Sequence, residues 1–79
     1  MESLRLGIYR HYKTGDEYRL LFIAKGQFSN SPLDMQDMVV YETVKDNPVS
    51  KWWVRPLTEF TEQVQHNEVP VPRFTFVRE

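Results

Sequence analysis

The sequence predicts a small all-β domain, folded as a rolled sheet or a partly open SH3-like barrel of four to six short strands with one short helix. Apolar and polar residues alternate over short segments, which is the period of half-buried strands. Clusters of Gly, Pro, Asn and Asp separate these segments, as turns do. The chain has two Trp, four Tyr and five Phe among 79 residues, and a rolled sheet buries many rings in a chain of this length. We expect one domain over residues 1–79.

Two strands and a turn are predicted in the N-terminal third. Apolar residues alternate along residues 4–9, and Gly7 within this segment indicates a bulge or a close approach of another backbone. Residues 13–16 contain a glycine and an aspartate and predict a turn. Residues 17–24 carry apolar side chains on both faces, so we expect this second strand to be central in the sheet.

The middle of the chain predicts a loop followed by two further strands. Residues 26–37 are the least regular part of the sequence and form the loop. Residues 38–44 are rich in β-branched residues and predict the third strand. Residues 51–55 predict the fourth strand, and Pro56 ends it because proline lacks the backbone donor that a strand needs.

One short helix is predicted directly after Pro56. Leu57, Phe60 and Val64 recur at three- and four-residue spacing, which places them on one face of a helix over residues 57–65. Thr58 is the expected N-cap, because its hydroxyl can accept a hydrogen bond from the first turn.

The C-terminal segment predicts extended structure. Two prolines within residues 69–72 exclude a helix there. Residues 73–77 predict the last strand, at an edge of the sheet, with Phe74 and Phe76 on the same side.

Trp52 and Trp53 are adjacent on the fourth predicted strand, so their side chains point to opposite faces. We expect Trp53 to lie in the core with Leu20, Tyr41 and Phe60, because apolar residues follow it along the chain. Trp52 is then the exposed ring.

Composition limits the possible sites and partners. The chain has no Cys and two His, so no thiolate metal site and no disulfide are expected, and we predict no metal and no cofactor. The formal net charge of −1 creates no general attraction for polyanions. No apolar run approaches the ~18 residues of a membrane span. The first residues do not resemble a signal peptide, so we expect a cytoplasmic protein without membrane contact.

Five short blocks follow one another along the chain: G-x-Y-x-H-Y-K over residues 7–13, Tyr18, V-V-Y over 39–41, W-V-R-P-L-x-x-F over 53–60 and V-P-R-F over 71–74. Their order resembles a bacterial family of uncharacterised proteins, domain of unknown function 1653 (DUF1653). The resemblance implies a small cytoplasmic bacterial domain and implies no activity. The chain departs from the family pattern at Thr14, which stands before Gly15, and over residues 26–35.

Polar and aromatic residues of these blocks are the candidate ligand-binding residues. A planar guanidinium can bind a carboxylate or a phosphate with two hydrogen bonds and can stack on a ring. His, Tyr and Lys side chains can contact the same anion. A structural role is equally open, with each Arg paired to Glu59, Glu62 or Asp37. The candidates are Tyr9, His11, Lys13, Tyr41, Arg55 and Arg73.

Three functions fit these residues. The first is a binding module that recognises an anionic small ligand, a nucleic-acid segment or a peptide through an aromatic and Arg-lined groove. The second is a protein–protein interaction or structural domain. The third is a small enzyme with His11 as general base and Arg55 as anion clamp. The sequence contains no G-x-S-x-G motif, no phosphate-binding glycine loop and no H-E-x-x-H motif, so no catalytic residue is assigned.

Overall fold

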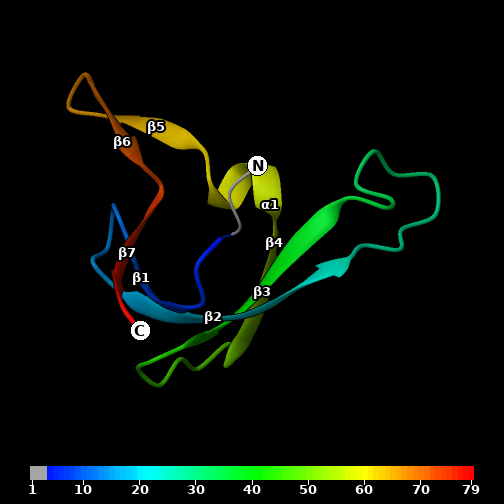
Figure 1. Cartoon of the computed structure of the whole chain (residues 1–79), viewed down its shortest axis with the longest axis horizontal. Coiled ribbons are helices and arrows are strands. Elements are labelled where there is room, and N and C mark those ends of the chain that lie inside the picture. The colour runs from blue at the N-terminus through cyan, green and yellow to red at the C-terminus, as the bar shows by residue number, and fades with distance from the viewer. Residues whose placement is uncertain (1–3) are drawn as a thin grey trace.

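A computed structural model describes residues 4–79, which form seven strands and one short helix (Figure 1). Five antiparallel strands make one sheet in the order β4-β3-β2-β1-β7, and two strands make a separate hairpin, β5-β6. The prediction of a small β-rich domain is confirmed, in an open form that is not closed into a barrel. The strands are β1 (Gly7–His11), β2 (Glu17–Lys25), β3 (Asp37–Thr43), β4 (Trp52–Pro56), β5 (Gln63–His66), β6 (Val69–Pro72) and β7 (Phe74–Arg78), and the helix is α1 (Leu57–Phe60).

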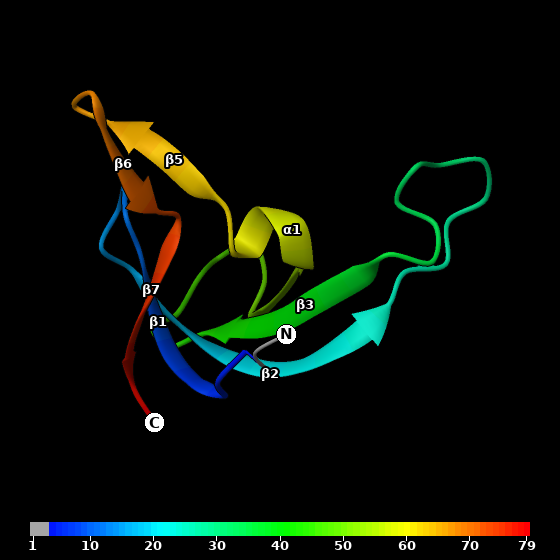
Figure 2. The ribbon, with the colours of Figure 1, turned by 45° about the horizontal axis from the view of Figure 1, so that its top comes forward.

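The five-stranded sheet curves around α1. Figures 1 and 2 show the long β2–β3 pair passing beneath α1, while the β5–β6 hairpin rises next to β1 and β7. Strand β2 lies at the middle of the sheet, as its two apolar faces predict. Directly opposite residues of antiparallel strands point to the same face. The register therefore puts Leu20, Tyr41 and Trp53 side by side on the face toward α1, which we call the inner face.

The core lies between this inner face and α1. Phe60 is the buried residue of α1, and its ring stacks on Phe74 with centroids 4.2 Å apart. Trp53 is half-buried and packs against the core, and its indole N–H donates to the Ser50 carbonyl at 3.1 Å. The predicted grouping of Trp53 with Leu20, Tyr41 and Phe60 is thus confirmed. The buried core consists of Tyr9, Leu20, Val39, Tyr41, Phe60 and Phe74.

The helix predicted over residues 57–65 is wrong beyond its first turn. α1 ends at Phe60, and Val64 instead lies in β5, opposite Val71 of β6. The β5–β6 turn has two residues, Asn67 and Glu68, with φ of 52° and 64°. Positive φ at both central positions is the type I′ geometry that matches the twist of a hairpin. The hairpin supplies β5 with a partner strand, and this pairing outweighs the local helical spacing. It also brings the number of strands above the predicted six.

The expected N-cap is also wrong. The residue at that position is Pro56, and no side chain caps the first turn of α1. The C-terminal end of α1 is closed by Thr61 instead, whose hydroxyl donates to the Leu57 carbonyl at 2.9 Å.

Strand β1 begins later than the alternation predicts. Leu6 is exposed, and the strand starts at Gly7, where both Ile8 and Tyr9 are buried on opposite faces. Gly7 has φ of 148°, and the pairing with β7 shifts register between Ile8 and Tyr9. The bulge that Gly7 predicted is therefore present, and it explains why the simple alternation fails at this point.

The two edges of the sheet are β4 and β7, so the predicted edge position of the last strand is confirmed. The Ser50 hydroxyl covers part of the β4 edge, since it donates to the Trp52 carbonyl at 2.7 Å and accepts from the Trp52 N–H at 3.1 Å. Pro56 has no N–H to present at the same edge. These features reduce the number of free backbone groups along the β4 edge that could pair with another strand. Within residues 4–79, no helix is long and apolar enough to cross a membrane.

The two tryptophans are expected to differ in their contribution to stability. Trp53→Ala should lower the free energy of unfolding by about 3 kcal/mol, the low end of the range for a large aromatic residue, because Trp53 is only half-buried. Trp52 is 61% exposed, and Trp52→Ala should cost less than about 1 kcal/mol. Urea unfolding of the two variants measures both values. Equal losses, or a larger loss for Trp52→Ala, would contradict this assignment.

Candidate anion-binding site

Arg55 lies on β4 opposite Val39 and points to the inner face of the sheet. Its Cζ atom is 5.6 Å from the centroid of the Phe74 ring, and its side chain is 28% exposed. The nearest charge partner is Glu59, whose Oε1 lies 3.6 Å from Arg55 Nη1. That distance allows an ion pair but not a hydrogen bond. The Arg55 Nε–H is buried without a hydrogen-bond partner in the described part of the chain.

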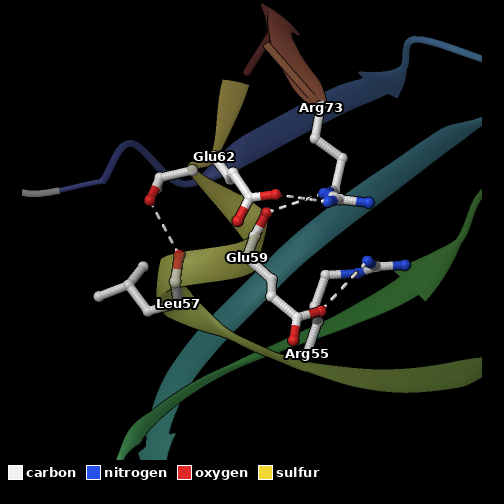
Figure 3. A network of polar contacts seen from close by, with 6 residues as sticks. Arg55, Leu57, Glu59, Glu62 and Arg73 are labelled. Atoms are coloured by element: carbon white, nitrogen blue, oxygen red, sulfur yellow. Dashed lines mark hydrogen bonds and ion pairs between the residues drawn. The ribbon is translucent and has the colours of Figure 1, made fainter. Parts of the chain in front are cut away.

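Arg73 is a structural anchor. Its Nε donates to the Glu59 carbonyl oxygen at 3.0 Å, and its Nη2 donates to Glu62 Oε1 at 2.8 Å. Its backbone N–H donates to the Glu62 carbonyl, and its own carbonyl accepts from the Tyr12 N–H, both at 3.0 Å. Arg73 therefore joins α1, the base of the β5–β6 hairpin and the end of β1. Figure 3 shows the guanidinium groups of Arg55 and Arg73 on the same side of Glu59, with the Arg73 side chain reaching down from above and the Arg55 side chain reaching up from below.

His11 stands at the end of β1, with its ring edge-on to Phe74 at a centroid distance of 5.0 Å. The backbone N–H of Lys13 donates to His11 Nδ1 at 3.2 Å, so the neutral ring carries its proton on Nε2. Partial burial lowers the pKa of His11 below its usual value, and the positive charges of Arg55 and Arg73 lower it further. His11 is thus a neutral side chain whose Nε2–H is a hydrogen-bond donor.

Tyr18 belongs to the same cluster, although it was not among the predicted ligand-binding residues. Its ring packs edge-on against Tyr41 and Phe74, with centroid distances of 5.3 and 5.9 Å. Burial raises the pKa of Tyr18, Asp16 and Tyr41 raise it further, and Arg55 acts in the opposite direction. Arg55 and Tyr18 both lie at the ring of Phe74. Tyr18 lies directly opposite Tyr9 in the β1–β2 pairing, so the register would have placed it on the same face.

Two of the predicted residues lie apart from this cluster. Tyr9 is buried, its hydroxyl donates to the Arg5 carbonyl at 2.7 Å, and its ring packs edge-on against Phe60 and Phe76. Tyr9 thus has a structural position in the core. The side chain of Lys13 is exposed in the turn after β1. The structure brings together four of the six predicted residues, and adds three that the prediction missed. We call these seven residues the Arg55 cluster: His11, Tyr18, Tyr41, Arg55, Glu59, Arg73 and Phe74.

A cavity of about 470 Å³ opens beside Tyr18, between the β1–β2 turn and the β3–β4 loop. Its lining has three acidic residues, Asp16, Glu17 and Asp46, against one basic residue, Lys45. These negative charges disfavour an anion inside the cavity.

The comparison with known proteins agrees with the blocks seen in the sequence. The family model described as "Protein of unknown function (DUF1653)" matches residues 7–76. A crystal structure of a protein of the same family from Bordetella bronchiseptica is 32% identical in sequence, with a TM-score of 0.82, and the similarity covers 99% of this chain and 92% of that one. No curated protein matches the chain. Since the family model spans most of the sequence, the chain belongs to the DUF1653 family.

Proposed function

We propose that this protein is a cytoplasmic binding module that recognises an anionic group at the Arg55 cluster. The observation that carries the proposal is the state of Arg55, which has a charged side chain without a hydrogen bond within residues 4–79 and a buried Nε–H without a partner. Leaving a buried donor unpaired costs about 1–3 kcal/mol. A bound anion would relieve this cost, because a small rotation of the guanidinium toward it pairs Nε–H and one Nη–H at once.

The surroundings of Arg55 support the same ligand chemistry. The His11 Nε2–H, the Tyr18 hydroxyl and the remaining N–H groups of Arg73 are donors. A group that only accepts hydrogen bonds, such as a carboxylate or a phosphate, complements such a set. The ring of Phe74 forms an apolar wall behind the guanidinium.

The predicted alternative in which His11 acts as a general base is not favoured. A base needs a free ring nitrogen to accept a proton. The Nδ1 atom of His11 already accepts the Lys13 N–H, and Nε2 carries the ring proton. The geometry supports a hydrogen-bond donor at this position instead.

The outer face of the sheet favours a second candidate function, an interaction domain. Phe22, Val40 and Val54 lie side by side across β2, β3 and β4, and Trp52 is exposed next to Val54 on the same strand. Contiguous exposed apolar side chains are a feature of protein interaction sites. Val54→Lys places a charge on this face. If the variant no longer binds a protein partner but still binds an anion as the wild-type protein does, this second function is favoured.

The main test compares Arg55→Lys with the wild-type protein in thermal melts with and without added acetate or phosphate. A ligand at ten times its Kd stabilises the folded state by about 1.4 kcal/mol, which raises Tm by roughly 5–10 °C in a domain of this size. Arg55→Lys should lose most of that rise, because lysine keeps the charge but loses the planar pair of donors. Its Tm without anion should change little, since Arg55 makes no hydrogen bond within residues 4–79.

Arg73→Lys is the matched control. It removes hydrogen bonds to Glu59 and Glu62, so its Tm without anion should fall. All melts need the same ionic strength, because salt alone screens surface ion pairs. The proposal is wrong if wild-type Tm does not respond to either anion, or if Arg55→Lys keeps the full response.

A further inference from the structure

We propose that the Glu59 carboxylate competes with the ligand for Arg55, and that the anionic group of the ligand takes the place of Glu59. This inference rests on the proposed function and concerns the same site. Glu59 then controls both how tightly the site binds an anion and which anion charge the site prefers.

The two carboxylates of the cluster are held differently. Glu59 Oε1 is 3.6 Å from Arg55 Nη1 and forms an ion pair without a hydrogen bond. Glu62 Oε1 accepts a hydrogen bond of 2.8 Å from Arg73. The two carboxylate side chains are about equally exposed, at 50% and 51%. The two carboxylates therefore do not differ in exposure. They differ in their contacts, since Glu62 accepts a hydrogen bond and Glu59 forms a longer ion pair. Glu59 is therefore the carboxylate that a ligand can displace.

The backbone of Glu59 can stay in place when its side chain moves. Its carbonyl oxygen accepts from Arg73 Nε at 3.0 Å and from the Glu62 N–H at 3.3 Å. Figure 3 shows the Glu59 side chain extending from α1 back to the guanidinium of Arg55. Rotation of that side chain into solvent would uncover Arg55 without unwinding α1. The carboxylate thus occupies the position that a ligand carboxylate would take.

Charge balance predicts a preference among anions. With both arginines and both glutamates in place, the four formal charges of this group cancel. A monoanion that displaces Glu59 leaves one extra negative charge near the site, and a dianion leaves two. Glu59 should therefore disfavour dianions more strongly than monoanions, since like charges at short distance repel. The wild-type site is expected to prefer a carboxylate to a doubly charged phosphate.

The test is an NMR titration of Glu59→Gln with acetate and with inorganic phosphate at about pH 8, where phosphate is largely a dianion. The shift of the Arg55 Nε–H signal reports binding directly. Removing an exposed or half-exposed ion pair changes the free energy of binding by about 0.2–1 kcal/mol, so the affinity for acetate should rise about 1.4- to fivefold. The affinity for phosphate should rise by a larger factor, because its repulsion by Glu59 is also removed.

Glu62→Gln is the control for general electrostatics, since it removes the same charge from the neighbouring acid. Its affinity for acetate should stay within about twofold of wild type, while its stability falls because Arg73 loses a hydrogen bond. If wild-type protein binds acetate but Glu59→Gln binds it no better, the inference fails and the proposed function stands. Equal gains in the two variants also overturn it. If no variant binds either anion, the proposed function fails as well.

Discussion

Phe60→Ala should lower the free energy of unfolding by about 3–5 kcal/mol, as expected for truncation of a fully buried aromatic ring. Phe60 is 2% exposed, and its ring contacts Phe74, Tyr9 and Tyr41 at centroid distances of 4.2, 5.2 and 5.8 Å. A chain of this length buries only about 60% of the surface that its unfolded form exposes, so its total stability lies near the low end of about 5–15 kcal/mol. We therefore expect Phe60→Ala to keep no more than about 2 kcal/mol of stability and to melt at a much lower temperature than the wild-type protein.

Phe22→Ala is the matched control, because it removes the same atoms from the outer face, where Phe22 is 54% exposed. It should cost less than about 1 kcal/mol. Phe60→Leu keeps most of the buried volume, should cost about 1.5 kcal/mol, and keeps the test measurable if the alanine variant does not fold. Urea unfolding followed by tryptophan fluorescence compares the three. A Phe22→Ala loss as large as that of Phe60→Leu would show that the core does not centre on α1.

Gly7→Ala has the other large expected effect, about 2–6 kcal/mol. At φ of 148° a side chain is strained, and a Cβ atom built there would lie 2.6 Å from the Arg78 carbonyl oxygen and 2.9 Å from a ring carbon of Phe76. Backbone strain of this kind costs about 1–3 kcal/mol, and overpacking adds about 1–3 kcal/mol. The close approach involves backbone of β7, so a side-chain rotation alone cannot relieve it.

Gly15→Ala separates the two contributions. Gly15 also has positive φ, 76°, but a Cβ atom there would meet nothing within 4 Å. Its substitution should cost about 1–2 kcal/mol from the backbone alone. Thermal melts of both variants test the difference. If Gly15→Ala is as destabilising as Gly7→Ala, the contact with β7 contributes nothing and our account of the bulge is incorrect.

The sequence alone determined the β-rich class, the central position of β2, the edge position of β7 and the opposite faces of Trp52 and Trp53. Each of these follows from the two-residue period of a strand and from proline or glycine at defined positions. Gly7 belongs to the same group, because a glycine within an apolar strand segment indicates a bulge. These signals depend on residues that are close together in the sequence, and the observed strand order and register agree with them.

The tertiary structure alone decided where α1 ends and what each arginine does. Leu57, Phe60 and Val64 fit a helix by spacing, but Val64 gains a strand partner in β6 that no local pattern indicates. The hairpin joins positions only seven residues apart, and its pairing overrides helix propensity, which is weak over a few residues.

The roles of the two arginines in the candidate site were likewise decided by the tertiary structure. Arg55 and Arg73 look equivalent in sequence, since each adjoins a proline. Folding places Arg73 within hydrogen-bonding distance of α1 and Glu62. It places Arg55 over the Phe74 ring, with Glu59 at 3.6 Å, too far for a hydrogen bond. Tyr18 and Phe74 join them because the register of β1, β2 and β7 brings distant positions to one face. A guanidinium becomes an anchor or a free donor according to which acceptors the fold brings near it, and those distances are set by tertiary packing.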